Sequence, residues 1–239
     1  MKILITNDDG IQAEGIKVLV ELAKQYGQVF VVAPYSNQSA TSHKININCG
    51  FKAEEYFGFK DVKAYQIDSS PADCVRFAEY YLKIPYDIVF SGINSGFNLG
   101  FDMLYSGTVA GATEAAYYGK KGIAFSTSSS SFNGVKKDFD NLMNYLLIKE
   151  VWNSSKIFNV NFPEISKGIK LTVQGDTHFE TTFVNKENLV YQIGSPNFGK
   201  DKDNLKSDVN AIINNYISVT PIVADKTNYQ ALEELKDKY

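Results

Sequence analysis

Short apolar runs alternate along the first 150 residues with segments whose apolar positions recur at helical spacing. Residues 3–6 predict a buried strand, and the spacing of Ile16, Leu19 and Ala23 predicts the helix that follows it. Residues 29–32 predict the second strand. This order is typical of a βαβ unit, in which a right-handed crossover joins two parallel strands.

The same alternation continues through the rest of this region. Further strands are predicted at 63–68, 87–90 and 122–126, with a weaker alternating run at 44–48, and further helices at 71–82, 109–118 and 138–148. We therefore expect an α/β fold whose mostly parallel sheet carries helices on both faces.

The pattern changes after residue 156. Strands are predicted at 157–162, 170–174, 189–193 and 216–219 and a last helix at 228–238, whereas 194–208 is polar and weakly patterned. We interpret 1–150 as the core and 151–239 as a C-terminal β-rich extension, with one continuous domain as the alternative. The last strand and helix carry apolar faces that an exchange between subunits would bury, so we expect the extension to take part in oligomerisation.

Charge narrows the classes of partner. The 239 residues include 24 basic and 27 acidic ones, a net charge of −3. That balance argues against binding to a nucleic acid polymer or an anionic membrane.

Two features of the sequence favour a cytoplasmic protein. We find no leader-like segment and no apolar run near the roughly 18 residues of a membrane helix. In addition, Cys49 and Cys74 fit reduced thiols, so we expect a cytoplasmic protein.

Two adjacent carboxylates, Asp8 and Asp9, follow the first predicted strand. Like charges at the end of a buried strand repel each other and lose hydration, which favours a bound cation. Ser39 follows the second strand, and Asn94 the strand at 87–90. Because ligands bind beyond the carboxyl ends of parallel strands, we expect these oxygen donors to meet. Hard oxygen ligands favour Mg²⁺ or Mn²⁺, and also suit Ca²⁺.

A phosphate site is expected beside the metal. Ser106, Gly107 and Thr108 begin a helix, where backbone N–H groups, hydroxyls and the positive end of the helix dipole suit an anion. Asn98 belongs to the same edge of the sheet. A metal next to a phosphate site suggests hydrolysis of a phosphoryl group, with Asp8 and Asp9 as the catalytic residues. We interpret His43 and His178 as structural or surface residues.

Several motifs then resemble those of the SurE family, the stationary-phase survival proteins. They occur in order at residues 5–10 (ITNDDG), 33–39 (APYSNQS), 70–75 (SPADCV), 91–100 (SGINSGFNLG), 105–109 (YSGTV), 159–163 (NVNFP) and 218–221 (SVTP). The resemblance covers nearly the whole chain.

This resemblance implies a Rossmann-like core and a C-terminal extension that interlocks subunits into homodimers or homotetramers. It implies one divalent metal ion per subunit, held by Asp8, Asp9, Ser39 and Asn94. The implied activity is hydrolysis of nucleoside 5'- and 3'-monophosphates to nucleoside and phosphate, with short polyphosphate as a further substrate of some members. Attack by a metal-activated water and attack by an aspartate both fit these residues.

A noncatalytic alternative is a metal- or phosphate-sensing module of the receiver type. Such a module also carries an acidic pair after its first strand. It would require a third, acceptor aspartate at the end of the third sheet strand, for which Asp68 is the candidate. The chain is about twice the size expected of such a module, and its Ser-Gly-Thr turn would have no role there.

Overall fold

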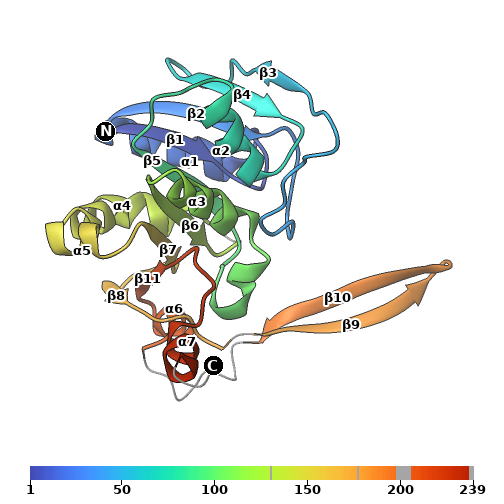
Figure 1. The fold of residues 1–239 in the computed structure, drawn as a ribbon, viewed down its shortest axis with the longest axis vertical. Helices are drawn as coiled ribbons and strands as arrows, with labels where there is room; N and C mark the ends of the chain where they lie inside the picture. The colour runs from blue at the N-terminus through green and yellow to red at the C-terminus, as the bar shows by residue number, and fades with distance from the viewer. Residues whose placement is uncertain (130, 177, 198–205, 237–239) are drawn as a thin grey trace.

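The computed structural model describes residues 1–239 except 130, 177, 198–205 and 237–239. Its main element is a nine-stranded sheet in the order β3-β4-β2-β1-β5-β6-β7-β11-β8 (Figure 1). The strands are β1 (Lys2–Thr6), β2 (Gln28–Pro34), β3 (Ala53–Glu55), β4 (Lys63–Ile67), β5 (Ile88–Ser95), β6 (Lys121–Thr127), β7 (Ile157–Phe162), β8 (Ile169–Leu171) and β11 (Ile217–Ile222). In this order, the six strands from β4 to β7 are parallel to one another. At the two sides, β3 is antiparallel to β4 and β11 is antiparallel to β7.

Helices cover both faces of this sheet. The α-helices are α1 (Glu14–Ala23), α2 (Pro71–Tyr80), α3 (Gly107–Tyr117), α4 (Asn133–Leu146), α5 (Lys149–Ser154), α6 (Asp208–Ile213) and α7 (Tyr229–Leu235), with short 3-10 helices η1 (Lys24–Tyr26) and η2 (Gly100–Leu104). Ile3 and Ile5 pack with α1 and α4, whereas Leu4 between them packs with α2 and α3. Alternate side chains of a strand point to opposite faces, so one short strand contributes to two cores.

The predicted α/β fold with a mostly parallel sheet and helices on both faces is confirmed. The ends of several elements differ from the prediction: α4 begins five residues earlier, α3 begins at Gly107, and β8 is shorter than the strand predicted at 170–174. The weak alternating run at 44–48 forms no strand, and the short strand β3 lies further along the chain instead. Residues 44–48 have many polar side chains and follow the second strand as part of a loop. Residues 237 and 238 of the predicted last helix lie outside the described residues.

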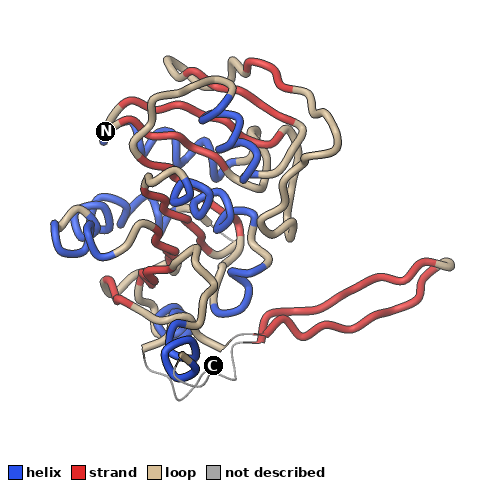
Figure 2. Tube along the Cα trace, in the orientation of Figure 1, coloured by secondary structure: helices blue, strands red, loops and turns tan. Residues whose placement is uncertain are grey.

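A long hairpin projects from the rest of the molecule. It consists of β9 (His178–Lys186) and β10 (Leu189–Asn197), which pair only with each other (Figure 2). The sequence predicted part of β10 but neither β9 nor α6. In contrast, β7 and β11 extend the same sheet as β1, so strands from both sides of residue 150 share one sheet. Within the described residues, no helix is long and apolar enough to cross a membrane.

Candidate metal and phosphate site

A tight turn after β1 carries the acidic pair. The side-chain Nδ2 of Asn7 donates to the carbonyl oxygen of Gly10 over 2.8 Å. Gly10 has φ +98°, a conformation that glycine adopts without strain. The next amide, of Ile11, donates to the carbonyl of Pro34 at the end of β2, 2.8 Å away. These bonds fix the turn against the neighbouring strand. The positions of Asp8 and Asp9 are fixed with it.

Asp8 is buried and is bound by the start of α3. Its Oδ1 accepts from the hydroxyl of Thr108 over 2.5 Å, and its Oδ2 accepts from the Thr108 amide over 3.0 Å. Burial raises the pKa of Asp8 to about 6, the nearby charge of Asp9 adds to the increase, and the hydrogen bonds from Thr108 oppose it. A cation beside Asp8 would favour the ionised carboxylate in this setting.

Asp9 is less buried and has fewer partners. Its Oδ2 accepts from the amide of Ser95 over 3.2 Å. Burial raises the pKa of Asp9 as well. Asp8 is therefore held more rigidly than Asp9, although the two are adjacent in sequence.

Ser39 lies in the loop after β2, which is tied to the acidic turn. The amide of Gln38 donates to the carbonyl oxygen of Asp8 over 2.7 Å, and the Ser39 amide donates to Asn37 Oδ1 over 2.8 Å. The Ser39 side chain is exposed at this edge of the sheet. The loop thus brings a hydroxyl next to the turn that carries the two carboxylates.

Asn94 comes from an irregular end of β5. The pairing of β5 with β6 shifts register between Ser91 and Asn94, which marks a bulge. Gly92 within it has φ +135°, and a Cβ there would lie 2.4 Å from the carbonyl oxygen of Phe125, so only glycine fits. The Nδ2 of Asn94 donates to the carbonyl of Gly96 over 2.8 Å. This bond directs the amide nitrogen to the backbone and leaves Oδ1 as the group suited to a cation.

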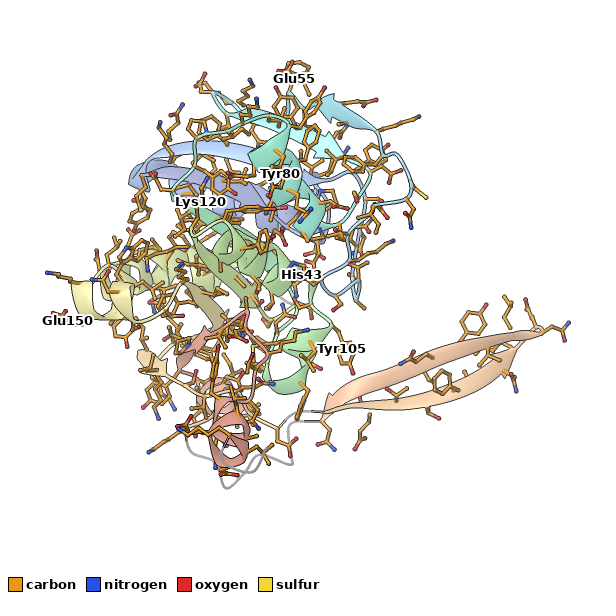
Figure 3. The ribbon with its side chains drawn as sticks, viewed as in Figure 1. His43, Glu55, Tyr80, Tyr105, Lys120 and Glu150 are labelled. Carbon is orange, nitrogen blue, oxygen red and sulfur yellow. The ribbon has the colours of Figure 1, made fainter. Side chains whose placement is uncertain are left out.

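All four predicted metal ligands line one cavity of about 470 Å³. Asn98 and Ser106 line the same cavity. Further lining residues, which the sequence did not indicate as site residues, are Ser95, Phe97, Asp102, Tyr105 and Ser128. Tyr105, labelled in Figure 3, directly precedes Ser106, and Ser128 belongs to the serine run after β6. The sequence shows only that these residues are next to predicted site residues or elements. It does not show whether a loop side chain points into the cavity.

The predicted phosphate residues divide into two groups. Asn98 and Ser106 line the cavity. Thr108 is fully buried, and a Cβ on Gly107 would lie 2.9 Å from Asp8 Cβ, so both pack behind the carboxylate and do not line the cavity. The Ser106 hydroxyl accepts from the Val109 amide over 3.0 Å and caps α3. A phosphate contact by Gly107 or Thr108 stays a prediction.

Asn98 is fixed by a buried polar network. Its Nδ2 donates to Ser126 Oγ over 2.8 Å, and its amide donates to Asn161 Oδ1 over 2.9 Å. Its carbonyl oxygen accepts from the side chains of Asn159 and Asn161 on β7. Residues from both sides of residue 150 therefore hold the rim of the cavity.

The donor set fits a hard divalent cation. Two carboxylates, one hydroxyl and one amide oxygen supply oxygen ligands only, as Mg²⁺ and Mn²⁺ prefer. Among the described residues, no group of three or more His, Cys, Asp and Glu side chains is suited to a metal.

Asp68, the candidate acceptor of a receiver-type module, lies elsewhere. It lines a different cavity, at the end of β4, and β2 separates β4 from β1. The candidate acceptor Asp68 therefore does not lie beside the acidic pair.

Comparisons with known proteins point to one family. The family model described as "Survival protein SurE" matches residues 3–181. The chain is 40% identical to "5'-nucleotidase SurE" of Alkaliphilus metalliredigens, covering 99% of this chain and 98% of that one. It is 36% identical to the protein of the same name from Pelotomaculum thermopropionicum, covering 99% and 94%. The crystal structure of the SurE protein from Aquifex aeolicus has a TM-score of 0.83 at 31% identity and covers 100% of this chain and 99% of that one.

Proposed function

The chain belongs to the SurE family, and we propose that it is a 5'-nucleotidase that hydrolyses nucleoside 5'-monophosphates to nucleosides and inorganic phosphate. The observation that carries this proposal is the shared cavity, which joins the acidic pair after β1 to the capped start of α3. A phosphate monoester has room there, at about 470 Å³, next to both carboxylates and the Ser106 hydroxyl.

We propose that Asp8, Asp9, Ser39 and Asn94 hold one divalent metal ion, Mg²⁺ or Mn²⁺, with Ca²⁺ as another ion that fits the oxygen ligands. When bound, the ion polarises the phosphoryl group and lowers the pKa of water. Asp8, fixed by Thr108, acts as the rigid ligand, and the more exposed Asp9 is the residue that faces the reacting phosphoryl group. Attack by water and attack by an aspartate both remain compatible with this arrangement.

On the substrate side, we assign phosphate binding to Ser106 and Asn98. The Ser106 hydroxyl accepts one hydrogen bond from Val109 and can still donate one to a phosphate oxygen. In either route the P–O bond to the nucleoside breaks, the oxygen of one water ends on phosphorus, and the nucleoside oxygen takes up a proton released by that water. The proposal extends to nucleoside 3'-monophosphates and short polyphosphates, which present the same terminal phosphoryl group.

We also propose that the chain forms a homodimer or homotetramer through its C-terminal part. The hairpin β9–β10 carries exposed apolar side chains on both faces, and Leu189, Tyr191 and Ile193 form a row on one of them. They alternate along β10 with residues of the opposite face. A second copy of the chain would bury this row, which has no cover from the described part of its own subunit.

A phosphate-release assay tests the proposal. Purified protein is treated with EDTA, and release is measured from a panel of 5'- and 3'-monophosphates and tripolyphosphate, with Mg²⁺, Mn²⁺ or Ca²⁺ added back. We expect activity on monophosphates that is lost on chelation and returns with Mg²⁺ or Mn²⁺. Release that survives complete chelation would reject the metal-dependent mechanism, and release from no nucleotide would reject the nucleotidase assignment.

A further inference from the structure

The loop that carries Ser39 is held on both sides. On one side the Gln38 amide donates to Asp8. On the other, the Ser42 amide donates to the carbonyl of Tyr105 over 3.0 Å, and the Ser42 hydroxyl donates to the carbonyl of Leu104 over 2.7 Å. Ser39 therefore lies between two attachments, one to β1 and one to the segment before α3.

The loop adopts an unfavourable backbone conformation between these attachments. Ala40 has φ +58° and Ser42 has φ +54°. Residues with a Cβ seldom adopt this left-handed region, which costs about 1 to 2 kcal/mol per residue. Tertiary contacts are needed to keep the loop, and with it the Ser39 hydroxyl, in this form.

The next residue, His43, makes such a contact. Its Nε2 lies 2.6 Å from Oε2 of Glu114 on α3. The side chain of His43 is 41% exposed, whereas that of Glu114 is 7% exposed. An ionised carboxylate only accepts hydrogen bonds, so the imidazole Nε2 carries the proton. Figure 3 labels His43, which lies beside α3 in this view.

Glu114 is a firm attachment point. Its Oε1 accepts from the hydroxyl of Tyr118 over 2.7 Å and from Arg76 over 3.1 Å. Burial by itself raises the pKa of Glu114, but the hydrogen bonds from His43, Tyr118 and Arg76 outweigh it, and the net effect is a lowered pKa. The carboxylate is thus kept charged and fixed on the helix whose first turn also binds Asp8.

His43 and Glu114 lie outside the metal cavity. They line a second cavity of about 540 Å³, which shares only Ser106 with the first. The pair therefore cannot touch an ion held by the acidic turn. Its route to the site is the loop, because only three residues lie between Ser39 and His43.

We propose that the His43–Glu114 hydrogen bond is a clamp that positions Ser39 and so sets the affinity of the site for its divalent ion. The inference rests on the proposed metal site. It makes His43 a positioning residue, which acts through the loop and has no contact with substrate. α3 then orients two of the proposed ligands at once: Asp8 through Thr108, and Ser39 through Glu114.

Mn²⁺ binding tests the clamp without any turnover. Free Mn²⁺ is quantified by electron paramagnetic resonance during titration of wild type, His43→Ala, His43→Gln and Lys44→Ala. We expect His43→Ala to raise the Kd for Mn²⁺ about tenfold, which corresponds to about 1.4 kcal/mol. His43→Gln places an N–H donor near the position of Nε2 and should recover most of the affinity. Lys44→Ala, which removes the neighbouring exposed side chain, should match wild type.

Two further readouts separate positioning from a loss of fold. The melting temperature of metal-free His43→Ala should stay within a few degrees of wild type, and its turnover at saturating Mn²⁺ should approach the wild-type value. If His43→Ala unfolds, His43→Leu, which has a side chain of similar size but no donor, replaces it in the titration with the same expectation.

Each unfavourable result has a distinct meaning. Unchanged Mn²⁺ affinity in His43→Ala, with normal binding by wild type, would overturn the clamp and leave the proposed function intact. Equal weakening in His43→Ala and His43→Gln would also overturn it, because the donor would then be irrelevant. A wild-type protein that binds neither Mn²⁺ nor Mg²⁺ would instead reject the proposed metal site itself.

Discussion

Thr108 binds both carboxylate oxygens of Asp8, a residue one hundred positions earlier in the chain, through its hydroxyl at 2.5 Å and its amide at 3.0 Å. Because both donors come from one residue at the start of α3, the carboxylate and the helix have a fixed mutual orientation. Gly107 permits this approach, since a Cβ there would lie 3.1 Å from Asp8 Oδ2. The acidic turn and the helix start thus form one unit.

Thr108→Val should raise the pKa of Asp8 further and weaken metal binding. The hydroxyl hydrogen bond stabilises the ionised form, and its loss leaves one oxygen of a buried carboxylate without its donor, at a cost of about 1 to 3 kcal/mol. Titration of carboxyl ¹³C signals in EDTA measures the pKa. Thr113→Val is the matched control, because its hydroxyl binds only the Val109 carbonyl within α3. Equal pKa values in wild type and Thr108→Val would contradict the expectation.

Asp8→Asn and Asp9→Asn should each lower turnover at least a hundredfold, equivalent to about 3 kcal/mol of transition-state stabilisation. Each substitution removes a charge that the proposed ion requires, while the side-chain shape is kept. Circular dichroism should show an unchanged fold. Isothermal titration with Mn²⁺ should show weaker binding in both. Near-wild-type activity of both variants would remove the acidic pair from the mechanism.

The contribution of Asp8 to the stability of the metal-free protein should fall as the pH rises. The pKa of Asp8 is raised from 3.8 to about 6 in the folded state, so the folded form binds the proton more tightly than the unfolded form. The resulting stabilisation is complete below pH 3.8 and is lost as the pH rises through about 6. It amounts to about 3 kcal/mol at most, since one pKa unit is worth about 1.4 kcal/mol.

Urea unfolding in EDTA at several pH values measures this effect. The difference in unfolding free energy between Asp8→Asn and wild type should grow in favour of the variant between pH 4 and pH 7, because asparagine carries no charge into the buried position. Saturating Mn²⁺ should abolish the growth by stabilising the wild type. A difference that is constant with pH would show that Asp8 titrates normally.

Ser106→Ala should weaken phosphate binding and leave metal binding nearly unchanged. Its hydroxyl lines the cavity, and loss of one hydrogen bond to an anion costs about 1.5 to 3 kcal/mol. The change also removes the cap of α3, so stability should fall by about 1 kcal/mol. Ser207→Ala is the control, because Ser207 caps α6 in the same way but does not line the cavity. Calorimetry showing equal losses of metal and phosphate affinity would assign Ser106 to the metal instead.

Charges on one face of the hairpin should disrupt the proposed assembly. Tyr191→Lys combined with Ile193→Lys places two cations in the exposed apolar row, whereas Glu164→Lys, which changes the net charge by the same amount at an exposed residue outside the hairpin, is the control. Light scattering coupled to gel filtration should give a smaller particle for the double variant only. An unchanged mass in the double variant would direct the search for the interface to other surfaces.

The parallel core was predictable because each element carries a complete local signal. The strand β1 is a short apolar run followed by a helix with regular apolar spacing, and the crossover rule then fixes the topology. The missed elements lack such signals. β9 contains Glu180, Thr181, Thr182 and Asn185 and forms only by pairing with β10, and α6 has only six residues. β9 thus depends on its pairing with the strand that follows it, and α6 is too short to show a helical repeat.

The meeting of Asp8, Ser39 and Asn94 at one cavity was predictable, whereas the contacts within that cavity's walls were not. The edge rule for parallel sheets brings Asp8, Ser39 and Asn94 together without any knowledge of side-chain geometry. The bond between Thr108 and Asp8 depends on how closely α3 packs against β1, which the sequence does not encode locally. Likewise, the sequence indicated only a structural or surface role for His43. Its contact with Glu114 was not predictable because the two residues are 71 positions apart in the chain.

The hundred residues between Asp8 and Thr108 also set a delay during synthesis. A chain that grows at about 5 to 20 residues per second adds that interval in roughly 5 to 20 seconds. During this time Asp8 and Asp9 have been synthesised, but Thr108, which orients Asp8, has not. A nascent chain stalled before α3 therefore carries the acidic pair without its organising helix, and the proposed metal site is completed only after that helix has been synthesised and has packed on the sheet.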